Sequence, residues 1–492
     1  MPPAPLQLDE IAVASSRQHP RRVWMKNAMA LIREAVWGSK QDFTVISIDR
    51  AVVLLAVPVV LEMAMESLFG IVDIIFVAHL GAVATATVGL TEGLMIVVST
   101  IAAGLSAGAA AMVSRRVGEK DGDGAADAAV QSILLGIVAS ALLFVLCLPL
   151  APSLLSWMGA GPEIVRAGSA YTRITMSSSG IVLMLFLMNA ILRSSGDAAT
   201  AMRVLWLANL VNLCLDPCLI LGLGPFPKLG VTGAALATLI GRSLGVVAQL
   251  FILCRGLGRV VIGRKHLKVN FKLLTGILKI GVSGTLQSGI TLSSWLVMAR
   301  LVQSFGAAVA AGYTVALRIV VFSMVPSWGL SAAAATLVGQ NLGARQYQRA
   351  EQAVWRAGFF NMIFLGSLSA IFLFFAPSIG RIFSEDPAVI AASASCLRIM
   401  SLCYVIYAWG LVIVQALNGA GDTLTPSVIN IVCYWVVQLP LAFLLGRRLQ
   451  FGPNGLFFAI FTSQLVMSLV SIGVFRRGKW KTYAVLGAEP AA

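Results

Sequence analysis

The stretch L-S-A-G-A-A-A-M-V-S-R-R-V-G at residues 105–118 returns, with changes, as L-S-A-A-A-A-T-L-V-G-Q-N-L-G at residues 330–343. The two copies lie 225 positions apart, and the same offset relates matching residues along much of the chain. Such pairs are Gly81/Gly306, Pro152/Pro377, Arg173/Arg398, Gly196/Gly421 and Asp197/Asp422. A mostly apolar repeat of about 200 residues is typical of secondary transporters, which bind substrate between two related halves.

The composition indicates a chain that lies mainly in lipid. Of its 492 residues, 58% are hydrophobic and only 12% are charged. Apolar runs long enough to cross about 30 Å of hydrocarbon fall at 51–78, 84–113, 126–148, 168–192, 204–223, 232–254, 273–303, 308–338, 355–376, 390–416, 427–446 and 455–475. Because lipid offers backbone groups no hydrogen-bond partner, we predict an all-α integral membrane protein with twelve transmembrane helices.

The repeat divides these helices into two six-helix lobes. An even number of spans in each copy means that both copies insert the same way up, so a pseudo-two-fold axis is expected along the membrane normal. We predict an N-lobe at 51–254 and a C-lobe at 273–476, joined by a basic linker at 255–272. An N-terminal arm at 1–50, with a short amphipathic surface helix, and a tail at 477–492 complete the chain.

The net charge of +15 reflects topology rather than a nucleic-acid partner. Most of the 36 lysines and arginines lie in the terminal segments and in the connections on one side of the membrane. Positive residues concentrate on the cytoplasmic side of membrane proteins. We therefore predict cytoplasmic termini and a cytoplasmic (inner) membrane location, with lipid as a partner, no nucleic acid, and a monomeric chain.

No constellation of catalytic or metal-binding residues is visible in the sequence. The seven cysteines all fall within or at the ends of the apolar runs, which gives neither a disulfide framework nor metal spacing. A phosphate-binding G-x4-G-K-[ST] motif is missing, so nothing supports ATP-driven transport. We predict no enzyme activity, no cofactor and no bound metal beyond a coupling ion, H+ or Na+.

Acidic side chains within the spans lie almost wholly in the first copy. Glu62, Glu66 and Asp73 fall within about 40° of one another on a helix of 100° per residue. Span 2 carries Glu92, and span 5 carries a second stripe made of Asn209, Asn212 and Asp216. A charged acid at mid-bilayer costs about 2.5–3.5 kcal/mol, so such acids must be neutralised, paired or hydrated. A proton or a cation would do this; the alternative for Glu62, Glu66 and Glu92 is structural pairing or a place near the lobe surface.

The repeat supplies an internal comparison for these acids. In the second copy, uncharged residues stand at the positions of all four. They are Gln287 for Glu62, Thr291 for Glu66, Met298 for Asp73 and Leu317 for Glu92. The scaffold is thus repeated while the charge is not, and we predict that ion coupling belongs to the N-lobe.

At this point the residues resemble those of the multidrug and toxic compound extrusion (MATE) family, over nearly the whole chain after residue 50. The segments that carry the resemblance are V-P-V-V-L-E-M (57–63), I-V-D-I-I-F-V-A-H-L-G (71–81), N-L-C-L-D-P (212–217), G-V-T-G-A-A-L-A-T (230–238), V-G-Q-N-L-G-A (338–344) and A-L-N-G-A-G-D-T-L-T-P (416–426). The Asn-x3-Asp-Pro form of span 5 looks like the DinF-like branch.

The resemblance implies a cation or proton site with four members in the N-lobe. They fall on Asp73, Asn212, Asp216 and Thr238, with Thr232 as the alternative for the threonine. Some other branches use an acid in span 7. This chain has Gln287 in that span, which argues against that version of coupling.

Further candidates concern the substrate and the conformational change. Gln287, Tyr404, Tyr407 and Gln415 are candidates for the substrate cavity, where the tyrosines would contact a flat cation through their rings; core or lipid-belt packing is the alternative. Pro58 is the hinge candidate, because a proline inside a helix removes a hydrogen bond and permits a kink.

These observations predict a secondary active antiporter that exports cationic or amphipathic small molecules in exchange for H+ or Na+ by rocking of the two lobes. An alternative is a flippase for lipid-linked oligosaccharide, from the related exporter superfamily, for which a basic cavity is expected. A passive channel or membrane scaffold is a third class, and the unpaired internal acids argue against it.

Overall fold

The computed structural model describes residues 20–39 and 41–483, and this part of the chain contains helices and loops but no strand. The predicted arm and tail therefore lie partly outside the described residues. One helix, α2 (Pro20–Trp37), comes before the first lobe. That lobe consists of α3 (Ile48–Ala78), α4 (Ala82–Gly118), α5 (Gly122–Trp157), α6 (Pro162–Ser177), α7 (Ser179–Ser194), α8 (Ala198–Leu221) and α9 (Val231–Arg255).

The second lobe follows a linker that contains the short 3₁₀-helix η2 (Arg264–Leu267). It consists of α10 (Phe271–Gln303), α11 (Ala307–Ser323), α12 (Val325–Gly343), α13 (Tyr347–Phe383), α14 (Pro387–Ser401), α15 (Tyr404–Gly419), α16 (Leu424–Asn430), η3 (Ile431–Gln438), α17 (Leu439–Phe443), η4 (Leu444–Arg448) and α18 (Pro453–Arg476), with η5 (Lys479–Thr482) behind it. The predicted all-helical, two-lobe architecture is confirmed.

The number of membrane spans is consistent with the predicted twelve. Within the described residues, nine helices are long and apolar enough to cross a bilayer, and two bent pairs raise this number to eleven. The predicted seventh span corresponds to α10, which has 33 residues and is not among these eleven. Its many polar side chains make it less apolar than a typical span. Part of α10 faces the other lobe rather than lipid, which explains why it tolerates Gln287 and several serines and threonines.

Several spans predicted as single helices are interrupted. The predicted span 308–338 is bent by 44° between α11 and α12, and the span 390–416 is bent by 65° between α14 and α15. The predicted span 427–446 contains two π-helical segments, η3 and η4, on either side of Pro440. Since proline donates no backbone hydrogen bond, its carbonyl partner one turn earlier is released, and a widened turn accommodates this.

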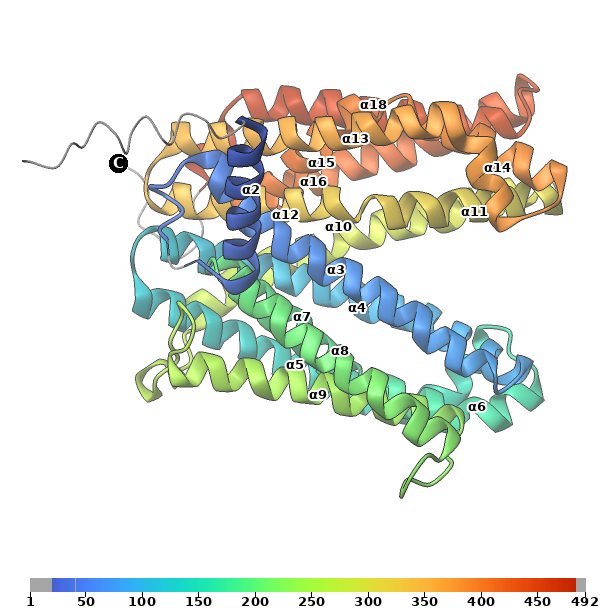
Figure 1. Cartoon of the computed structure of the whole chain (residues 1–492), viewed down its shortest axis with the longest axis horizontal. Helices are drawn as coiled ribbons and strands as arrows, with labels where there is room; N and C mark the ends of the chain where they lie inside the picture. The colour runs from blue at the N-terminus through green and yellow to red at the C-terminus, as the bar shows by residue number, and fades with distance from the viewer. Residues whose placement is uncertain (1–19, 40, 484–492) are drawn as a thin grey trace, which may run out of the picture.

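The two lobes form a V in side view (Figure 1). They converge at the end of the molecule where α2 lies, and they spread apart at the opposite end. Most of the contacts between the lobes are made by α4 with α10 and α12, and by α3 with α12. We refer to these two ends as the closed end and the open end.

Glycines allow the backbones to touch at the closed end, and the contacts obey the pseudo-two-fold axis. A Cβ on Gly118 would lie 1.9 Å from the carbonyl oxygen of Gln340, and a Cβ on Gly343 would lie 2.0 Å from that of Arg115. Gly118 and Gly343 are repeat mates, as are Arg115 and Gln340. The same exchange relates Gly104, which contacts Gly281 and Thr285, to Gly329, which contacts Ala56 and Val60. The interface between the lobes is therefore built from the same contact used twice.

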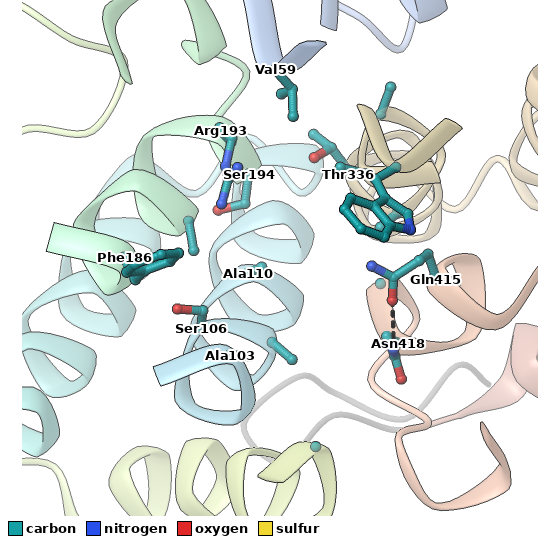
Figure 2. Close-up of a pocket in the computed structure, with 18 of the residues that line it drawn as sticks. Val59, Ala103, Ser106, Ala110, Phe186, Arg193, Ser194, Thr336, Gln415 and Asn418 are labelled. Carbon is teal, nitrogen blue, oxygen red and sulfur yellow. Dashed lines mark hydrogen bonds between the residues drawn. The ribbon is translucent and has the colours of Figure 1, made fainter. Parts of the chain in front are cut away.

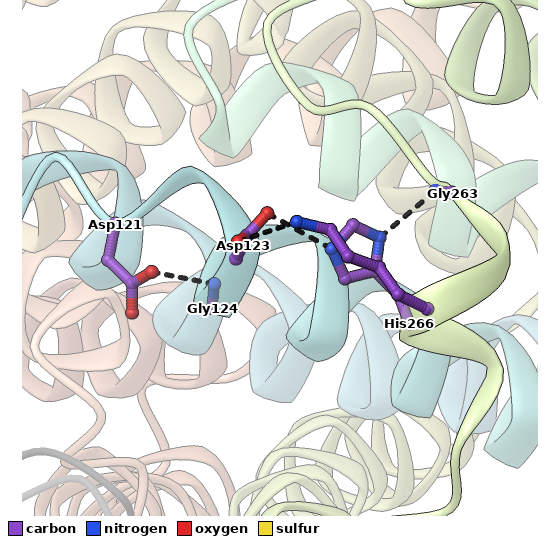
Figure 3. A network of polar contacts seen from close by, with 6 residues as sticks. Asp121, Asp123, Gly124, Gly263 and His266 are labelled. Carbon is purple, nitrogen blue, oxygen red and sulfur yellow. Dashed lines mark hydrogen bonds and ion pairs between the residues drawn. The ribbon is translucent and has the colours of Figure 1, made fainter.

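The linker between the lobes is attached to the start of α5 by a small polar network (Figure 3). Asp123 accepts hydrogen bonds from Lys265 Nζ at 2.7 Å and from His266 Nε2 at 3.2 Å. The backbone N–H of Gly263 donates to His266 Nδ1 at 3.0 Å, so the proton of the neutral imidazole is on Nε2. The bonds from Lys265 and His266 hold the pKa of the Asp123 carboxyl below its ordinary value.

The segment between α2 and α3 contacts both the linker and the second lobe at the closed end. Arg259, in the linker, donates to the carbonyl oxygens of Ser39 and Gln41 at 2.8 and 2.7 Å. Arg349, on α13, donates to those of Phe43 and Ile46. The Arg259 guanidinium also lies over the Phe43 ring, 4.7 Å from its centroid. One short segment thus connects the linker to the second lobe.

Candidate functional site: an acidic cluster and a cavity between the lobes

A buried carboxylate on α8 has an acidic neighbour on α3. Asp216 is fully buried, and neither oxygen of its carboxylate has a hydrogen-bond partner among the described residues. Asp73 is the charged group that acts on it. Two carboxylates facing each other in a poorly hydrated place repel, and the repulsion is relieved when a proton or cation is shared between them.

Asn212 and Thr238 complete this cluster. Asn212 lies one helical turn before Asp216, so both side chains project from the same side of α8. Its Nδ2 donates to Thr238 Oγ1 at 3.3 Å, and its Oδ1 is buried without a partner. Asn209, one turn earlier, has a buried Nδ2 without a partner as well. The structure thus brings together the four residues Asp73, Asn212, Asp216 and Thr238, which we call the acidic cluster.

The other predicted acids divide between two places. Glu92 on α4 acts electrostatically with Asp73 and with Arg242 of α9, so it borders the acidic cluster. Glu66 acts on Glu62 instead. Glu62 and Asp73 share one face of α3, but their eleven-residue separation places them about 16 Å apart along the helix axis. The predicted stripe therefore serves two separate sites.

Glu62 belongs to a polar network between α3, α7 and α9. It is only 4% exposed, and its Oε1 lies 3.7 Å from Nη1 of Arg193. Asn189 Nδ2 donates to the same oxygen at 3.2 Å, and Gln249 Nε2 donates to Asn189 Oδ1. The other carboxylate oxygen, Oε2, is buried without a partner among the described residues. Glu62 is thus paired with a basic residue inside the first lobe and lies apart from the acidic cluster.

A cavity of about 400 Å³ lies between the lobes, where they meet. Figure 2 shows Phe186, Arg193 and Ser194 on one side of it and Thr336, Gln415 and Asn418 on the other. Its lining is made of Leu55, Val59, Met63, Ala103, Ser106, Ala107, Ala110, Phe186, Ala190, Arg193, Ser194, Ala198, Gly284, Gln287, Ser288, Trp328, Ala332, Ala333, Ala335, Thr336, Gln415, Asn418 and Gly419. The lining is mainly apolar, with a few polar groups contributed by each lobe.

Two of the four predicted cavity residues line this cavity. Gln287 and Gln415 do so, and Gln415 Oε1 accepts a hydrogen bond from Asn418 Nδ2 at 2.8 Å. The structure places Tyr404 and Tyr407 elsewhere, in the apolar core of the second lobe. The ring of Tyr404 is fully buried and packs edge-on against Phe372. The two tyrosines therefore follow the core-packing alternative stated for them.

Pro58, the hinge candidate, lies inside α3, and the helix is continuous through it. It is buried where α3 packs against the second lobe. The hinge role stays a prediction.

Sequence reasoning missed Arg193. The predicted fourth span ends at residue 192, which assigned Arg193 to a loop as part of the basic excess, whereas α7 extends to Ser194. A signal was present in the repeat. The mates of Glu62 and Arg193 are Gln287 and Asn418, so an acid and a base are replaced together by two amides.

Comparison with known proteins identifies the family. A family model described as MatE matches residues 58–218 and 280–444, one segment in each lobe. The chain belongs to the MATE family. Members of this family are multi-pass membrane transporters rather than enzymes.

Two curated relatives and one solved structure match most of the chain. A probable multidrug resistance protein NorM from Thermotoga maritima is 27% identical over 454 residues, which are 90% of this chain and 95% of the relative. An FAD transporter from Shewanella oneidensis is 29% identical over 422 residues, 84% of this chain and 92% of the relative. A crystal structure of a MATE protein in complex with MaL6 superposes with a TM-score of 0.83 at 26% identity, covering 91% of this chain and all of that one.

Proposed function

We propose that this MATE protein is a secondary active antiporter that exports amphipathic small molecules in exchange for H+ or Na+. Family membership and the relatives named for multidrug resistance support small-molecule export. The relative named as an FAD transporter indicates that substrates differ among close relatives. The cavity between two pseudo-symmetric lobes is the expected place for substrate in a transporter built from repeats.

The single observation that carries the proposal is the carboxylate of Asp216. It is fully buried in a membrane-spanning helix, neither of its oxygens has a hydrogen-bond partner among the described residues, and Asp73 adds a second acid. Asn212 adds a third unpartnered acceptor, its Oδ1. Three buried oxygens without donors, next to a hydroxyl, are costly in an apolar lobe if they stay without a partner. A bound proton or Na+ would satisfy them.

The proposed mechanism is alternating access by rocking of the lobes. Basic residues gather at the closed end, which supports a cytoplasmic position for that end and for both termini, in an inner membrane. The structure is then open to the outside. An ion that enters from outside and binds Asp73 and Asp216 neutralises the acidic cluster and shifts α3. Because α3 also carries Val59 and Met63 on the cavity wall, the shift weakens the retention of substrate. Return to the inward state releases the ion and admits the next substrate.

The cavity does not support the predicted preference for cationic substrates. The residues that line the cavity include no acidic side chain, so a cation placed there would have no counter-ion. The acids Asp73 and Glu92 belong to the separate cluster inside the first lobe. We therefore keep amphipathic character, and not positive charge, as the defining property of the substrate.

Transport in proteoliposomes tests this function. Efflux of amphipathic dyes is measured first under an imposed pH gradient and then under an imposed Na+ gradient, which also decides the coupling ion. Asp73→Asn and Asp216→Asn should still bind dye but lose gradient-driven efflux. Glu163→Gln is the matched control, because Glu163 is an exposed acid at the start of α6, and it should behave as wild type. Wild-type coupling in both aspartate variants would refute the proposal.

The flippase alternative is favoured by one observation, the basic residue Arg193 on the cavity wall. A pyrophosphate carries several negative charges, and a site for it is expected to hold several Arg or Lys side chains. The lining contains one. Failure to export any small dye, together with movement of a lipid-linked pyrophosphate between leaflets, would favour the flippase.

A further inference from the structure

Arg193 is the only charged side chain among the residues that line the central cavity. It extends from the last turn of α7, and its side chain lines the cavity and is 25% exposed. A guanidinium carries five N–H donors and no acceptor, in a planar arrangement that matches a carboxylate or a phosphate. An arginine in a mainly apolar cavity is therefore a strong and specific recognition group for an oxyanion.

The bonding capacity of Arg193 is largely unused. It forms an ion pair with Glu62, in which Nη1 of Arg193 lies 3.7 Å from Oε1 of Glu62, too far for a hydrogen bond. That carboxylate oxygen already accepts a hydrogen bond from Asn189. Among the described residues, no hydrogen bond from the Arg193 guanidinium is present. Glu62 thus balances the charge of Arg193 but leaves its donors free to point at another group.

A purely structural ion pair does not account for this geometry. Such a pair would use close, directed hydrogen bonds, whereas Oε2 of Glu62 is also left without a partner. The second lobe shows that the fold does not depend on the charges. There the repeat mates Gln287 and Asn418 occupy the equivalent places as neutral amides. The positive charge is an addition to one wall of an otherwise symmetric cavity.

We propose that Arg193 recognises an acidic group, a carboxylate or phosphate, on the transported molecule. The remaining lining describes the rest of that molecule. Phe186 and Trp328 offer aromatic surface, and Gln415 and Thr336 offer neutral hydrogen bonds from the opposite lobe. The substrate class is a flat, amphipathic organic acid that fits about 400 Å³. This inference rests on the proposed function, since it assumes that the central cavity is the substrate site.

Binding of two dyes of opposite charge tests the inference. Carboxyfluorescein and rhodamine 123 share one ring system, and each is titrated with the detergent-solubilised full chain while fluorescence anisotropy is recorded. Wild type should bind carboxyfluorescein more tightly than rhodamine 123. Arg193→Gln should weaken that binding about ten- to a hundred-fold, since a hydrogen-bonded charge is lost, and should leave rhodamine 123 binding unchanged or stronger. Arg193→Lys keeps the charge but loses the planar pair of donors, so its affinity should fall between those of wild type and Arg193→Gln.

Two further variants keep the test decisive if Arg193→Gln folds poorly. Glu62→Gln retains the arginine and removes its counter-ion, so carboxyfluorescein should bind more tightly. Arg255→Gln removes an exposed charge at the end of α9 and should change neither dye. Benzoate and phenyl phosphate, but not benzylamine, should displace the bound dye, and the stronger of the two acids identifies the preferred group.

Equal carboxyfluorescein affinity in wild type, Arg193→Gln and Glu62→Gln would overturn the inference. So would displacement by benzylamine alone. These failures are distinct from a failure of the proposed transport. Gradient-driven export of rhodamine 123 without Arg193-dependent anion binding would refute only the acidic substrate, whereas Arg193-dependent binding without gradient-driven export of any dye would refute only the antiport.

Discussion

Glu62 on α3 and Arg193 on α7 form an ion pair at the wall of the central cavity, and their repeat mates are the two amides Gln287 and Asn418. The ion pair lies in one lobe, and the amides occupy the matching places in the other. The asymmetry of this transporter is therefore present at the cavity as well as in the acidic cluster. Both asymmetric features involve α3, which connects them.

The ion pair gives a prediction about stability. Arg193→Asn should destabilise the chain by about 3 kcal/mol, because it leaves the buried carboxylate of Glu62 without a counter-charge. The double variant Glu62→Gln/Arg193→Asn copies the second lobe and should recover most of this loss. Thermal unfolding midpoints of the two single variants and the double variant in detergent give the coupling. Additive effects, in place of a coupling energy above about 1 kcal/mol, would show that the two residues do not act as a pair.

The glycine contacts at the closed end predict a conformational bias. Gly118→Ala and Gly343→Ala each place a Cβ about 2 Å from a carbonyl oxygen of the other lobe, and overpacking of this kind costs about 1–3 kcal/mol. Both variants should favour a state in which the lobes separate at the end where they converge in this structure. The two shifts should be similar, because the contacts are symmetric. Spin-label distances between residues 120 and 345 measure the shift. Gly289→Ala, which would meet nothing within 4 Å, is the control; an equal shift in that variant would contradict the account.

The threonine of the acidic cluster can be assigned by substitution. Thr238→Val removes the hydroxyl that accepts from Asn212 and should raise the ion concentration needed for half-maximal efflux by about five- to tenfold, as expected for one lost hydrogen bond. Thr232→Val, on the first turn of the same helix, should have little effect. The ion dependence of efflux in the two variants is the measurement. A larger effect of Thr232→Val would show that Thr232, and not Thr238, belongs to the ion site.

The linker contact predicts a simple pH dependence. The pKa of Asp123 is lowered by Lys265 and His266, so this attachment is complete above the ordinary pKa of an aspartate and is lost only as the pH falls through the lowered value. Hydrogen exchange of the linker around Lys265 should be unchanged between about pH 9 and 7, after correction for intrinsic rates. Asp123→Ala should speed that exchange at neutral pH. Asp121→Ala, which removes the cap of α5 and the ion pair with Arg116 but no contact of the linker, should leave it slow; fast exchange in both variants would indicate general loosening.

The sequence predicted the architecture because the repeat and the apolar runs act over hundreds of residues. It predicted the cluster of Asp73 and Asp216 because helical periodicity and membrane depth together place side chains in a lobe. It did not show that Glu62 lies in a different site, since a stripe along a helix says nothing about which neighbour each side chain meets. Arg193 was missed because hydropathy ends a span wherever a charge appears. The tyrosines of α15 were assigned to the cavity because the sequence does not distinguish the side of a helix that lines a cavity from the side that packs within its own lobe.

The central claim is that an ion bound at the acidic cluster drives export. The most direct measurement is the ion flux that accompanies export of carboxyfluorescein from proteoliposomes, with an internal pH dye for H+ and a radioactive tracer for Na+. We predict that one of the two ions moves against the direction of the exported dye at a fixed ratio, and that Asp216→Asn abolishes both fluxes while dye binding persists. Export against a gradient with neither ion moving, or a normal ion flux in Asp216→Asn, would contradict the account.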